Sequence, residues 1–279
     1  MKQIIRLVRC AFLSCLLLLP LLANSGPLKI VSTIKPIQMI VDEIAGPNVK
    51  SSLLLPQGAS PHHFRLKPSD IRRMWQADLI FWVGPKFESF LNQQIQRIFT
   101  DKSVVSLGRG LITLEGDAHI WLDPLLAVEI GQRIALSLIA IDSKNSVKYE
   151  ENLENWLKKM NLLDNQLTLL FATAKPPAYI LQHRSLDYFE DRYKLTHLAI
   201  INSGAEHQTS VKNLLVIDGL LASGQAKCVV LEPGFPQNLV TTLNISERSH
   251  IFTFDPLMHD AVDYADAIRL LGDKLLKCS

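Results

Sequence analysis

Short apolar runs alternate with helically periodic stretches in the first part of the chain. The apolar runs are rich in β-branched and aromatic residues, the pattern of strands buried on both faces. They cover residues 28–34, 49–55, 78–83 and 103–107. The segments between them repeat apolar side chains at helical spacing, and we expect helices at 36–45, 69–76 and 87–99. This alternation predicts parallel βαβ units and therefore an α/β lobe.

A long polar segment with helical periodicity follows. Residues 143–173 contain no glycine or proline and repeat apolar side chains from Leu153 to Leu170. They predict one helix that Pro176-Pro177 ends. A helix of about 30 residues is roughly 45 Å long, more than one small lobe needs. We therefore expect it to run along two lobes.

The last part of the chain repeats the strand–helix alternation. Strands are expected at 178–182, 198–201, 227–231 and 251–254, and helices at 211–223 and 264–277. The predicted fold is α/β, with two βα lobes that each hold a parallel four-stranded sheet, joined by one long rigid helix. We expect the N-terminal lobe at 26–142, the linking helix at 143–174 and the C-terminal lobe at 175–279. Open α/β sheets bind ligands at the carboxyl ends of their strands, which predicts a site in the interlobe cleft.

Residues 1–25 have the pattern of a cleaved export signal. Lys2, Arg6 and Arg9 precede an apolar run from Cys10 to Ala23, and small residues follow at the expected cleavage site. The run is shorter than the roughly 20 residues that span a bilayer, and we expect no later stretch to cross a membrane. Without the signal, the 29 Lys and Arg fall to 26 against 27 Asp and Glu, a net charge near −1. This balance argues against a nucleic-acid partner.

Two cysteines, Cys228 and Cys278, lie beyond the signal. An even pair in an exported protein favours a disulfide. The bond would close a loop of about 50 residues, worth on the order of 4 kcal/mol by the chain-entropy estimate. A zinc site built on the two thiolates is disfavoured, because no third cysteine or nearby histidine completes the set. We expect the disulfide to join the C-terminal helix to a strand.

Three histidines, far apart in the sequence, occupy predicted loops at the ends of strands or before helices. They are His62, His119 and His183, and Asp255 ends the last predicted strand in the same way. Imidazole is a common ligand for borderline-soft divalent metals. Position alone leaves a structural role open for each of them, because histidines at loop ends commonly bind only the backbone and an Asp before a proline often shapes a turn.

The segments around these residues resemble the zinc/manganese-type solute-binding proteins of ABC importers. The matching motifs occur in family order over most of the mature chain: Gly58-Ala-Ser-Pro-His62-His63-Phe64 with Lys67-Pro-Ser-Asp70, Ala77-Asp-Leu-Ile-Phe-Trp-Val-Gly84, Asp117-Ala-His-Ile-Trp-Leu-Asp-Pro124, His183 before Tyr188-Phe189, Cys228-Val-Val-Leu-Glu-Pro233 and Asp255-Pro-Leu257. The positions of Cys228 and Cys278 are most similar to those of the periplasmic zinc-uptake branch.

The resemblance implies roles for individual residues. His62, His119 and His183 are implied as metal ligands. Asp255 is the favoured fourth ligand, and the alternative is a nearby carboxylate with water completing the site. His63 and Glu232 are implied as neighbours of the ligands that do not bind the metal themselves, with Glu232 as an acceptor for a ligand imidazole. His197, His207, His250 and His259 match no ligand position and are expected to be solvated or structural.

The expected cargo is a single Zn²⁺ ion. Three imidazoles with one carboxylate suit tetrahedral zinc, whereas manganese binders of the family carry a glutamate at the position of His183. The segment 106–117 is short and lacks histidine, unlike the His-rich loop of many zinc-uptake members. This departure predicts one zinc per chain and no auxiliary site. Gly234 is a second departure, which leaves the surroundings of Glu232 open.

The resemblance implies capture of zinc in the periplasm and delivery to a membrane permease with its cytoplasmic ATPase. A monomer that is not an enzyme is expected. A manganese- or iron-binding member of the same family is the nearest alternative. A mononuclear zinc hydrolase with Glu232 as general base is the rival class, although the chain lacks a His-Glu-x-x-His helix. A secondary role as an adhesin stays open.

Overall fold

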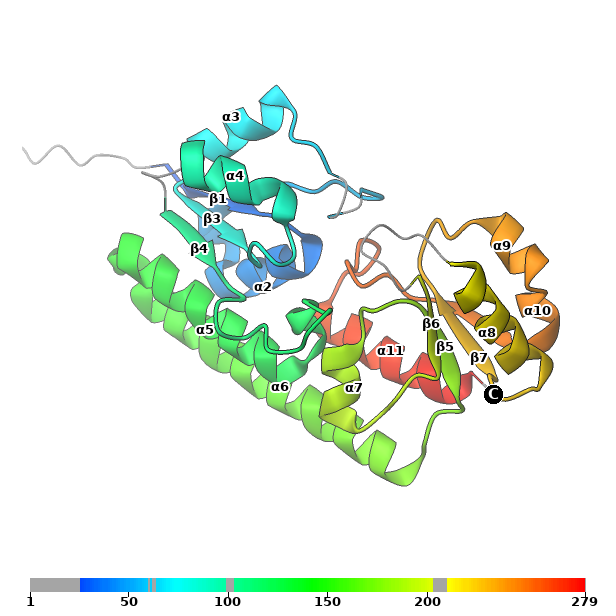
Figure 1. Cartoon of the computed structure of the whole chain (residues 1–279). Helices are drawn as coiled ribbons and strands as arrows, with labels where there is room; N and C mark the ends of the chain where they lie inside the picture. The colour runs from blue at the N-terminus through cyan, green and yellow to red at the C-terminus, as the bar shows by residue number, and fades with distance from the viewer. Residues whose placement is uncertain (1–25, 60, 62–63, 99–102, 203–209, 279) are drawn as a thin grey trace, which may run out of the picture.

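Two parallel four-stranded sheets form the framework of the protein (Figure 1). The structure is a computed structural model and describes residues 26–59, 61, 64–98, 103–202 and 210–278. The predicted signal segment 1–25, the ligand candidate His62 and its neighbour His63 lie outside the described residues, as does His207.

The two sheets have the same strand order. The first is β2-β1-β3-β4 and the second β6-β5-β7-β8, and every pairing is parallel. Their bounds are β1 Leu28–Ser32, β2 Val49–Leu53, β3 Leu79–Trp82, β4 Ser103–Ser106, β5 Tyr179–His183, β6 Ala199–Asn202, β7 Cys228–Leu231 and β8 His250–Thr253. The predicted α/β fold with two parallel four-stranded sheets is confirmed.

Strand β3 is a continuous apolar run because it is covered on both faces. Leu79 and Phe81 belong to one hydrophobic cluster, and Ile80 and Trp82 belong to another on the opposite face of the sheet. Successive side chains of a strand point to opposite faces, so a strand covered on both sides needs apolar residues throughout.

Helices cover both faces of each sheet. In the first lobe these are α2 Lys35–Ala45, α3 Pro68–Gln76 and α4 Ser89–Ile98. In the second they are α7 Asp187–Tyr193, α8 Val211–Ala222, α9 Gln237–Thr242, α10 Ile245–Arg248 and α11 Tyr264–Lys277. Short 3₁₀ turns occur at Gly46–Asn48, Ile120–Leu122 and Ser143–Asn145. The sequence did not predict helices α7, α9 and α10, because they are only four to seven residues long.

The long helix α6 Ser146–Thr173 runs along one side of both lobes, and α5 Pro124–Ile141 packs against it beside the first lobe (Figure 1). Helix α6 has 28 residues and is therefore about 42 Å long. It contacts α2 in the first lobe and α11 in the second. The predicted helix begins later than expected, because a 3₁₀ turn, closed by the amide of Asn145 on the carbonyl of Asp142, occupies residues 143–145.

Helix α5 corrects one expectation from the sequence. It is long and apolar enough to cross a membrane by length and composition, contrary to the prediction that no stretch after the signal would be. Its apolar residues Ile130, Ile134 and Leu138 are fully buried in the hydrophobic core, and the helix packs between α2 and α6. A core helix covered by its neighbours can be as apolar as a membrane span.

One hydrophobic core extends through both lobes. The same cluster contains Ile30 and Phe81 of the first sheet, Trp156 of α6 and Leu181 and Val230 of the second sheet. The lobes therefore share packed side chains along their α5–α6 side. Because protein interiors are close-packed, this arrangement resists large hinge motions between the lobes.

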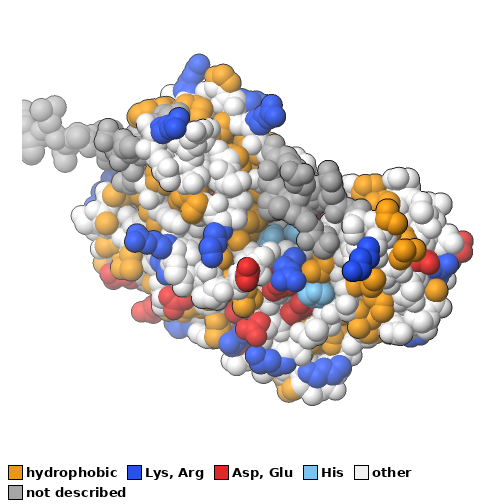
Figure 2. Space-filling view, in the orientation of Figure 1, with side chains coloured by type: hydrophobic (Ala, Val, Ile, Leu, Met, Phe, Trp, Pro, Cys, Tyr) orange, Lys and Arg blue, Asp and Glu red, His pale blue; other side chains and the backbone are white. Residues whose placement is uncertain are grey.

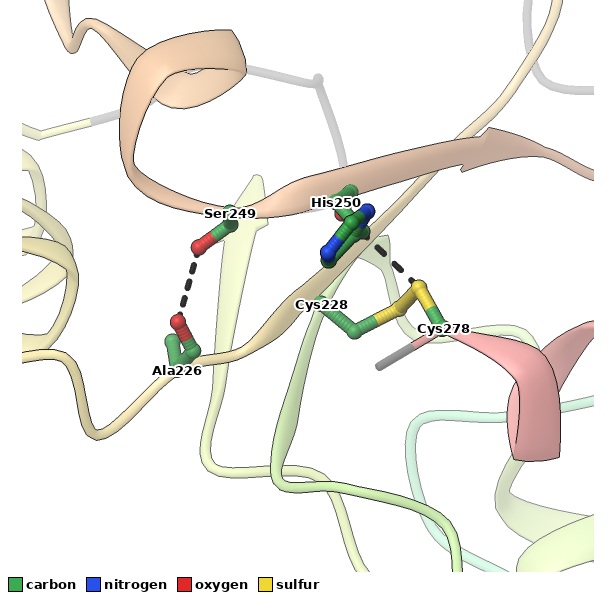
Figure 3. Close-up of a disulfide and its surroundings, with 5 residues drawn as sticks. All are labelled: Ala226, Cys228, Ser249, His250 and Cys278. Carbon is green, nitrogen blue, oxygen red and sulfur yellow. Dashed lines mark hydrogen bonds between the residues drawn. A yellow bond between two sulfur atoms is a disulfide. The ribbon is translucent and has the colours of Figure 1, made fainter.

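The predicted disulfide is present and joins Cys228 of β7 to Cys278 at the end of α11 (Figure 3). Their Cα atoms are 5.5 Å apart, and both residues are buried. The Sγ atom of Cys278 lies 3.8 Å from the carbonyl oxygen of His250 in the neighbouring strand β8. The bond fixes the C-terminal helix to the middle of the second sheet.

Candidate metal site

A cavity of about 520 Å³ opens between the lobes, and its walls are formed where strands end. The first lobe contributes the segment after β2 and His119, which lies beyond β4. The second contributes the carboxyl ends of β5 and β6 and the segments after β7 and β8. His119, His183, Glu232 and Asp255 all line this cavity. The structure therefore brings these four predicted site residues together.

His119 is held by a carboxylate two residues earlier. Asp117 Oδ1 lies 2.5 Å from His119 Nδ1 and accepts the backbone N–H of His119 at 2.7 Å. The ring packs against Phe87 and Trp121, with centroid distances of 5.2 and 5.1 Å. A carboxylate on Nδ1 favours the tautomer with the proton on Nδ1, so Nε2 keeps its lone pair for a metal.

His183 has the same arrangement at the end of β5. Its Nδ1 contacts Oε1 of Glu232, the residue that follows β7. The backbone N–H of Glu232 donates to Oε1 of Gln182 at 2.6 Å, which fixes the segment that carries this carboxylate. The contact matches the acceptor position that the resemblance implied for Glu232.

The rings of His119 and His183 lie next to each other, with centroids 5.3 Å apart. Hydrogen bonds between the segment 113–121 and helix α7 maintain this approach. Tyr188 Oη accepts the backbone N–H groups of Thr113 and Leu114 at 2.9 and 3.1 Å. The other carboxylate oxygen of Asp117, Oδ2, accepts the backbone N–H of Asp187 at 2.9 Å. The histidine from the first part of the chain is thereby anchored to the second lobe.

Asp255 begins a tight turn after β8. Its Oδ1 accepts the backbone N–H of Leu257 at 2.9 Å. Its Oδ2 accepts a hydrogen bond from the backbone N–H of His259 at 2.9 Å. The same oxygen lies 2.8 Å from Nδ1 of the His259 ring. Met258 adopts a left-handed conformation with φ of 53°, which closes the turn and brings the His259 ring back to Asp255. His259 also lines the cavity.

Both aspartates that face cavity imidazoles are held in the ionised form. Burial opposes ionisation of Asp117, but the adjacent His119 and the hydrogen bonds that the carboxylate accepts outweigh it and lower its pKa. In Asp255, burial is likewise outweighed by hydrogen bonds from His259 and Leu257, and the pKa is lowered. Each carboxylate therefore supplies negative charge beside an imidazole.

Two hydrogen bonds connect the two lobes near this turn. Gln57 Nε2 donates to Oδ1 of Asp260 at 2.6 Å, and Trp121 Nε1 donates to the carbonyl oxygen of Pro256 at 2.7 Å. Figure 2 shows histidine atoms at the surface between the lobes, with acidic and basic side chains around them. Gly58, Ala59 and Pro61 line the cavity, so the segment that carries His62 borders it.

The sequence patterns do not predict the role of Asp117 or the pairing of His259 with Asp255. The only available signal was spacing, because Asp117 precedes His119 by two residues and His259 follows Asp255 by four. His259 was expected to be solvated or structural; its side chain is 9% exposed, pairs with Asp255 and lines the cavity.

A second polar group lies outside the cavity lining. Ligand atoms of Asp187, Glu190 and His197 approach within 4.8 Å of one another. Hydrogen bonds already engage two of the three, because Glu190 Oε2 pairs with His197 Nδ1 at 2.8 Å and Oε1 accepts from Tyr179 Oη at 2.5 Å. These bonds connect α7 to β5 and support the position of His183 at the end of that strand.

Two α/β lobes, a long helix along both and a cavity lined by imidazole–carboxylate pairs define a solute-binding protein for a metal ion. A family model described as "Zinc-uptake complex component A periplasmic" matches residues 30–278. The chain belongs to this family of periplasmic zinc-uptake components.

Individual relatives agree with this assignment. The chain is 25% identical over 306 residues to the high-affinity zinc uptake system protein ZnuA of Yersinia pestis, covering 96% of each chain. It is 30% identical over 232 residues to a putative metal-binding protein of Thermotoga maritima, covering 82% of this chain and 84% of the relative. A crystal structure of ZnuA superposes with a TM-score of 0.80 at 22% identity, covering 90% of this chain and 99% of that one, and so shows the same fold.

Proposed function

We propose that this chain captures zinc in the periplasm and delivers it to the membrane permease of an ABC importer. The observation that carries the proposal is the approach of His119 and His183 in the interlobe cavity, each with a carboxylate at Nδ1. This arrangement is typical of imidazoles that bind a metal through Nε2.

The ring separation fits a shared ion. Two imidazoles on tetrahedral zinc, with Zn–N distances of about 2.0–2.1 Å, have ring centroids about 5.2 Å apart. The observed centroid distance is 5.3 Å. His62 is proposed as the third imidazole ligand, and the turn that begins at Asp255 supplies the fourth donor. His63 is proposed as a neighbour that does not bind the ion.

Nitrogen donors favour zinc over manganese, which prefers more carboxylate oxygens. The proposed stoichiometry is one zinc ion per chain. The segment 106–117, which carries the auxiliary histidines in many zinc-uptake proteins, contains no histidine here.

The proposed route begins with export, after which residues 1–25 are removed. The proposed units are an N-terminal lobe at 26–142, the linking helix at 143–174 and a C-terminal lobe at 175–279. The monomer then binds zinc and docks on a permease whose cytoplasmic ATPase drives import. Because the lobes share a core and α6 contacts helices of both, loading is expected to shift the lobes only slightly.

Native mass spectrometry of the purified mature chain tests the proposal. With zinc, manganese, nickel and copper offered together at limiting concentrations, the expected species holds one metal ion, and zinc is retained over manganese. Retention of manganese in preference to zinc would contradict the proposed cargo. A species with two zinc ions at low metal excess would contradict the proposed stoichiometry.

The same preparation tests for catalysis. We expect no hydrolysis of generic ester, peptide or phosphate substrates in the presence of zinc. Hydrolysis that disappears in Glu232→Gln would instead identify a hydrolase with Glu232 as its general base. The contact of Glu232 with His183 Nδ1 supports an orienting role for this carboxylate.

A further inference from the structure

We infer that His259 supplies the fourth zinc ligand through Nε2, and that Asp255 orients this imidazole without binding the metal. The inference rests on the proposed zinc-capture function and assigns an atom to the fourth position. It also gives a role to a histidine that matches no ligand position in the family resemblance.

The hydrogen bonds of the turn engage both oxygens of Asp255. Oδ1 accepts from the amide of Leu257, and Oδ2 interacts with both the amide and the ring Nδ1 of His259. A zinc ion at Oδ2 would compete with two hydrogen bonds, and withdrawal of the carboxylate would release the turn. The carboxylate is thus already engaged in holding the turn and the ring.

The His259 ring, in contrast to the Asp255 carboxylate, has a nitrogen atom that is available to bind a metal ion. The side chain is 9% exposed and lines the cavity. Its Nδ1 faces Asp255, which favours the proton on Nδ1 and leaves a lone pair on Nε2. Nε2 is buried and has no hydrogen-bond partner among the described residues. Buried polar nitrogens are normally satisfied, so one that lines a metal-type cavity points to a ligand.

The same chemistry occurs at the two other described histidines of the cavity. His119 Nδ1 faces Asp117 and His183 Nδ1 faces Glu232, as His259 Nδ1 faces Asp255. A carboxylate pair alone does not identify a ligand, because His197 pairs with Glu190 and does not line the cavity. His259 shares both features, the carboxylate at Nδ1 and the place in the cavity wall, with His119 and His183.

The turn is also fixed in position relative to the first lobe. Trp121 Nε1 donates to the carbonyl oxygen of Pro256, and Gln57 Nε2 donates to Asp260, so residues on both sides of His259 are anchored to the first lobe. An additional nitrogen donor in place of a carboxylate oxygen would also strengthen the preference for zinc over manganese.

The direct test is long-range ¹H–¹⁵N NMR of the mature chain with ¹⁵N-labelled histidine, recorded with and without one equivalent of zinc. The signals of His119, His183 and His259 are assigned from His→Gln variants. Zinc is expected to move Nε2 of all three rings from the position of a free lone pair to that of a coordinated nitrogen. If zinc shifts the Nε2 signals of His119 and His183 but not that of His259, the inference about His259 is wrong and the proposed zinc-capture function is supported. If none of the three responds to zinc, the proposed function itself fails.

Affinity measurements with a competing chelator provide a second readout. His259→Ala is expected to weaken zinc binding at least tenfold, and His250→Ala, at an exposed histidine nearby in β8, is the matched control with unchanged affinity. In Asp255→Asn the amide oxygen can still accept from the ring, so zinc should still shift the Nε2 signal of His259. Full zinc affinity in a folded His259→Ala protein would overturn the inference.

Discussion

The carboxylate of Asp117 connects His119 to the second lobe. One oxygen lies 2.5 Å from Nδ1 of His119, and the other accepts the backbone N–H of Asp187 at the start of α7. A single buried side chain therefore orients a proposed zinc ligand and fixes it beside the strand that ends at His183.

Asp117→Ala is expected to weaken zinc binding about 10–100-fold, the range typical of lost carboxylate partners of metal-bound histidines. The physical reason is that the His119 ring loses its preferred tautomer and orientation. Competition with a fluorescent zinc chelator measures the change. Glu115→Gln, at an exposed carboxylate on the same segment, is the control and should bind zinc normally. Unchanged affinity in a folded Asp117→Ala protein would contradict the role of Asp117.

His119→Ala and His183→Ala are each expected to weaken zinc binding at least tenfold while the protein remains folded. Each variant removes one of the two imidazole rings whose centroids lie 5.3 Å apart in the cavity. Titration calorimetry gives the affinity, and circular dichroism verifies the fold. An affinity equal to that of wild type in either variant would show that the zinc site lies elsewhere.

Glu88 is expected to make stability depend on pH. Burial raises the pKa of this carboxyl group from 4.5 to about 7, although Thr33 and the amides of Val83 and Gly84 donate hydrogen bonds to it. The pKa of Glu88 is higher in the folded than in the unfolded protein. Its contribution to the free energy of unfolding is therefore fully present below pH 4.5 and is lost as the pH rises through 7. A pKa shift of this size corresponds to about 3 kcal/mol in the free energy of unfolding.

Urea unfolding of wild type and Glu88→Gln at pH 4.5, 6 and 8 measures this effect. The stability of wild type relative to the variant should decrease by about 3 kcal/mol from the lowest to the highest pH, since Gln does not titrate. A difference that stays constant or increases with pH would show that the Glu88 pKa is not raised in the folded protein.

Removal of the disulfide in Cys228→Ser/Cys278→Ser is expected to lower the free energy of unfolding by about 4 kcal/mol, because the bond closes a loop of 50 residues in the unfolded chain. Chemical denaturation of the oxidised wild type and the double variant tests this. Zinc affinity at temperatures where the variant is folded should be unchanged, since the bond lies at the far end of β7 from Glu232. Loss of zinc binding in the folded variant would assign the disulfide a functional role.

Gly131→Ala is expected to destabilise the protein by about 1–3 kcal/mol through overpacking of the α5–α6 contact. A Cβ atom at Gly131 would lie 2.6 Å from Cδ1 of Trp156, which is buried and donates to the carbonyl oxygen of Ala127. Gly219→Ala on α8 is the matched control, because its Cβ meets nothing within 4 Å, and it should increase stability by up to about 1 kcal/mol. Thermal unfolding compares the two, and equal effects would contradict tight packing at Gly131.

Apolar runs predicted inner strands such as β3 and β7 because these strands are buried on both faces, and helical spacing predicted most of the helices. In β3 every residue from Leu79 to Trp82 is buried, and the resulting apolar run is unambiguous. Helix α7 was missed because its seven residues are too few for a periodic pattern. The apolar character of α5 was misjudged, because composition alone does not separate a buried core helix from a membrane-spanning one.

The sequence by itself determined the alternation of strands and helices, the pair of cysteines beyond residue 25 and the motifs that contain His119, His183 and Asp255. These depend on local periodicity and short spacing, which are present in the chain before it folds. Only the tertiary structure decided that Asp117, Glu232 and Asp255 each face an imidazole, and that His259 lines the same cavity. Such contacts join the ends of separate strands, and even the close pair Asp255 and His259 meets only because the turn between them reverses at Met258.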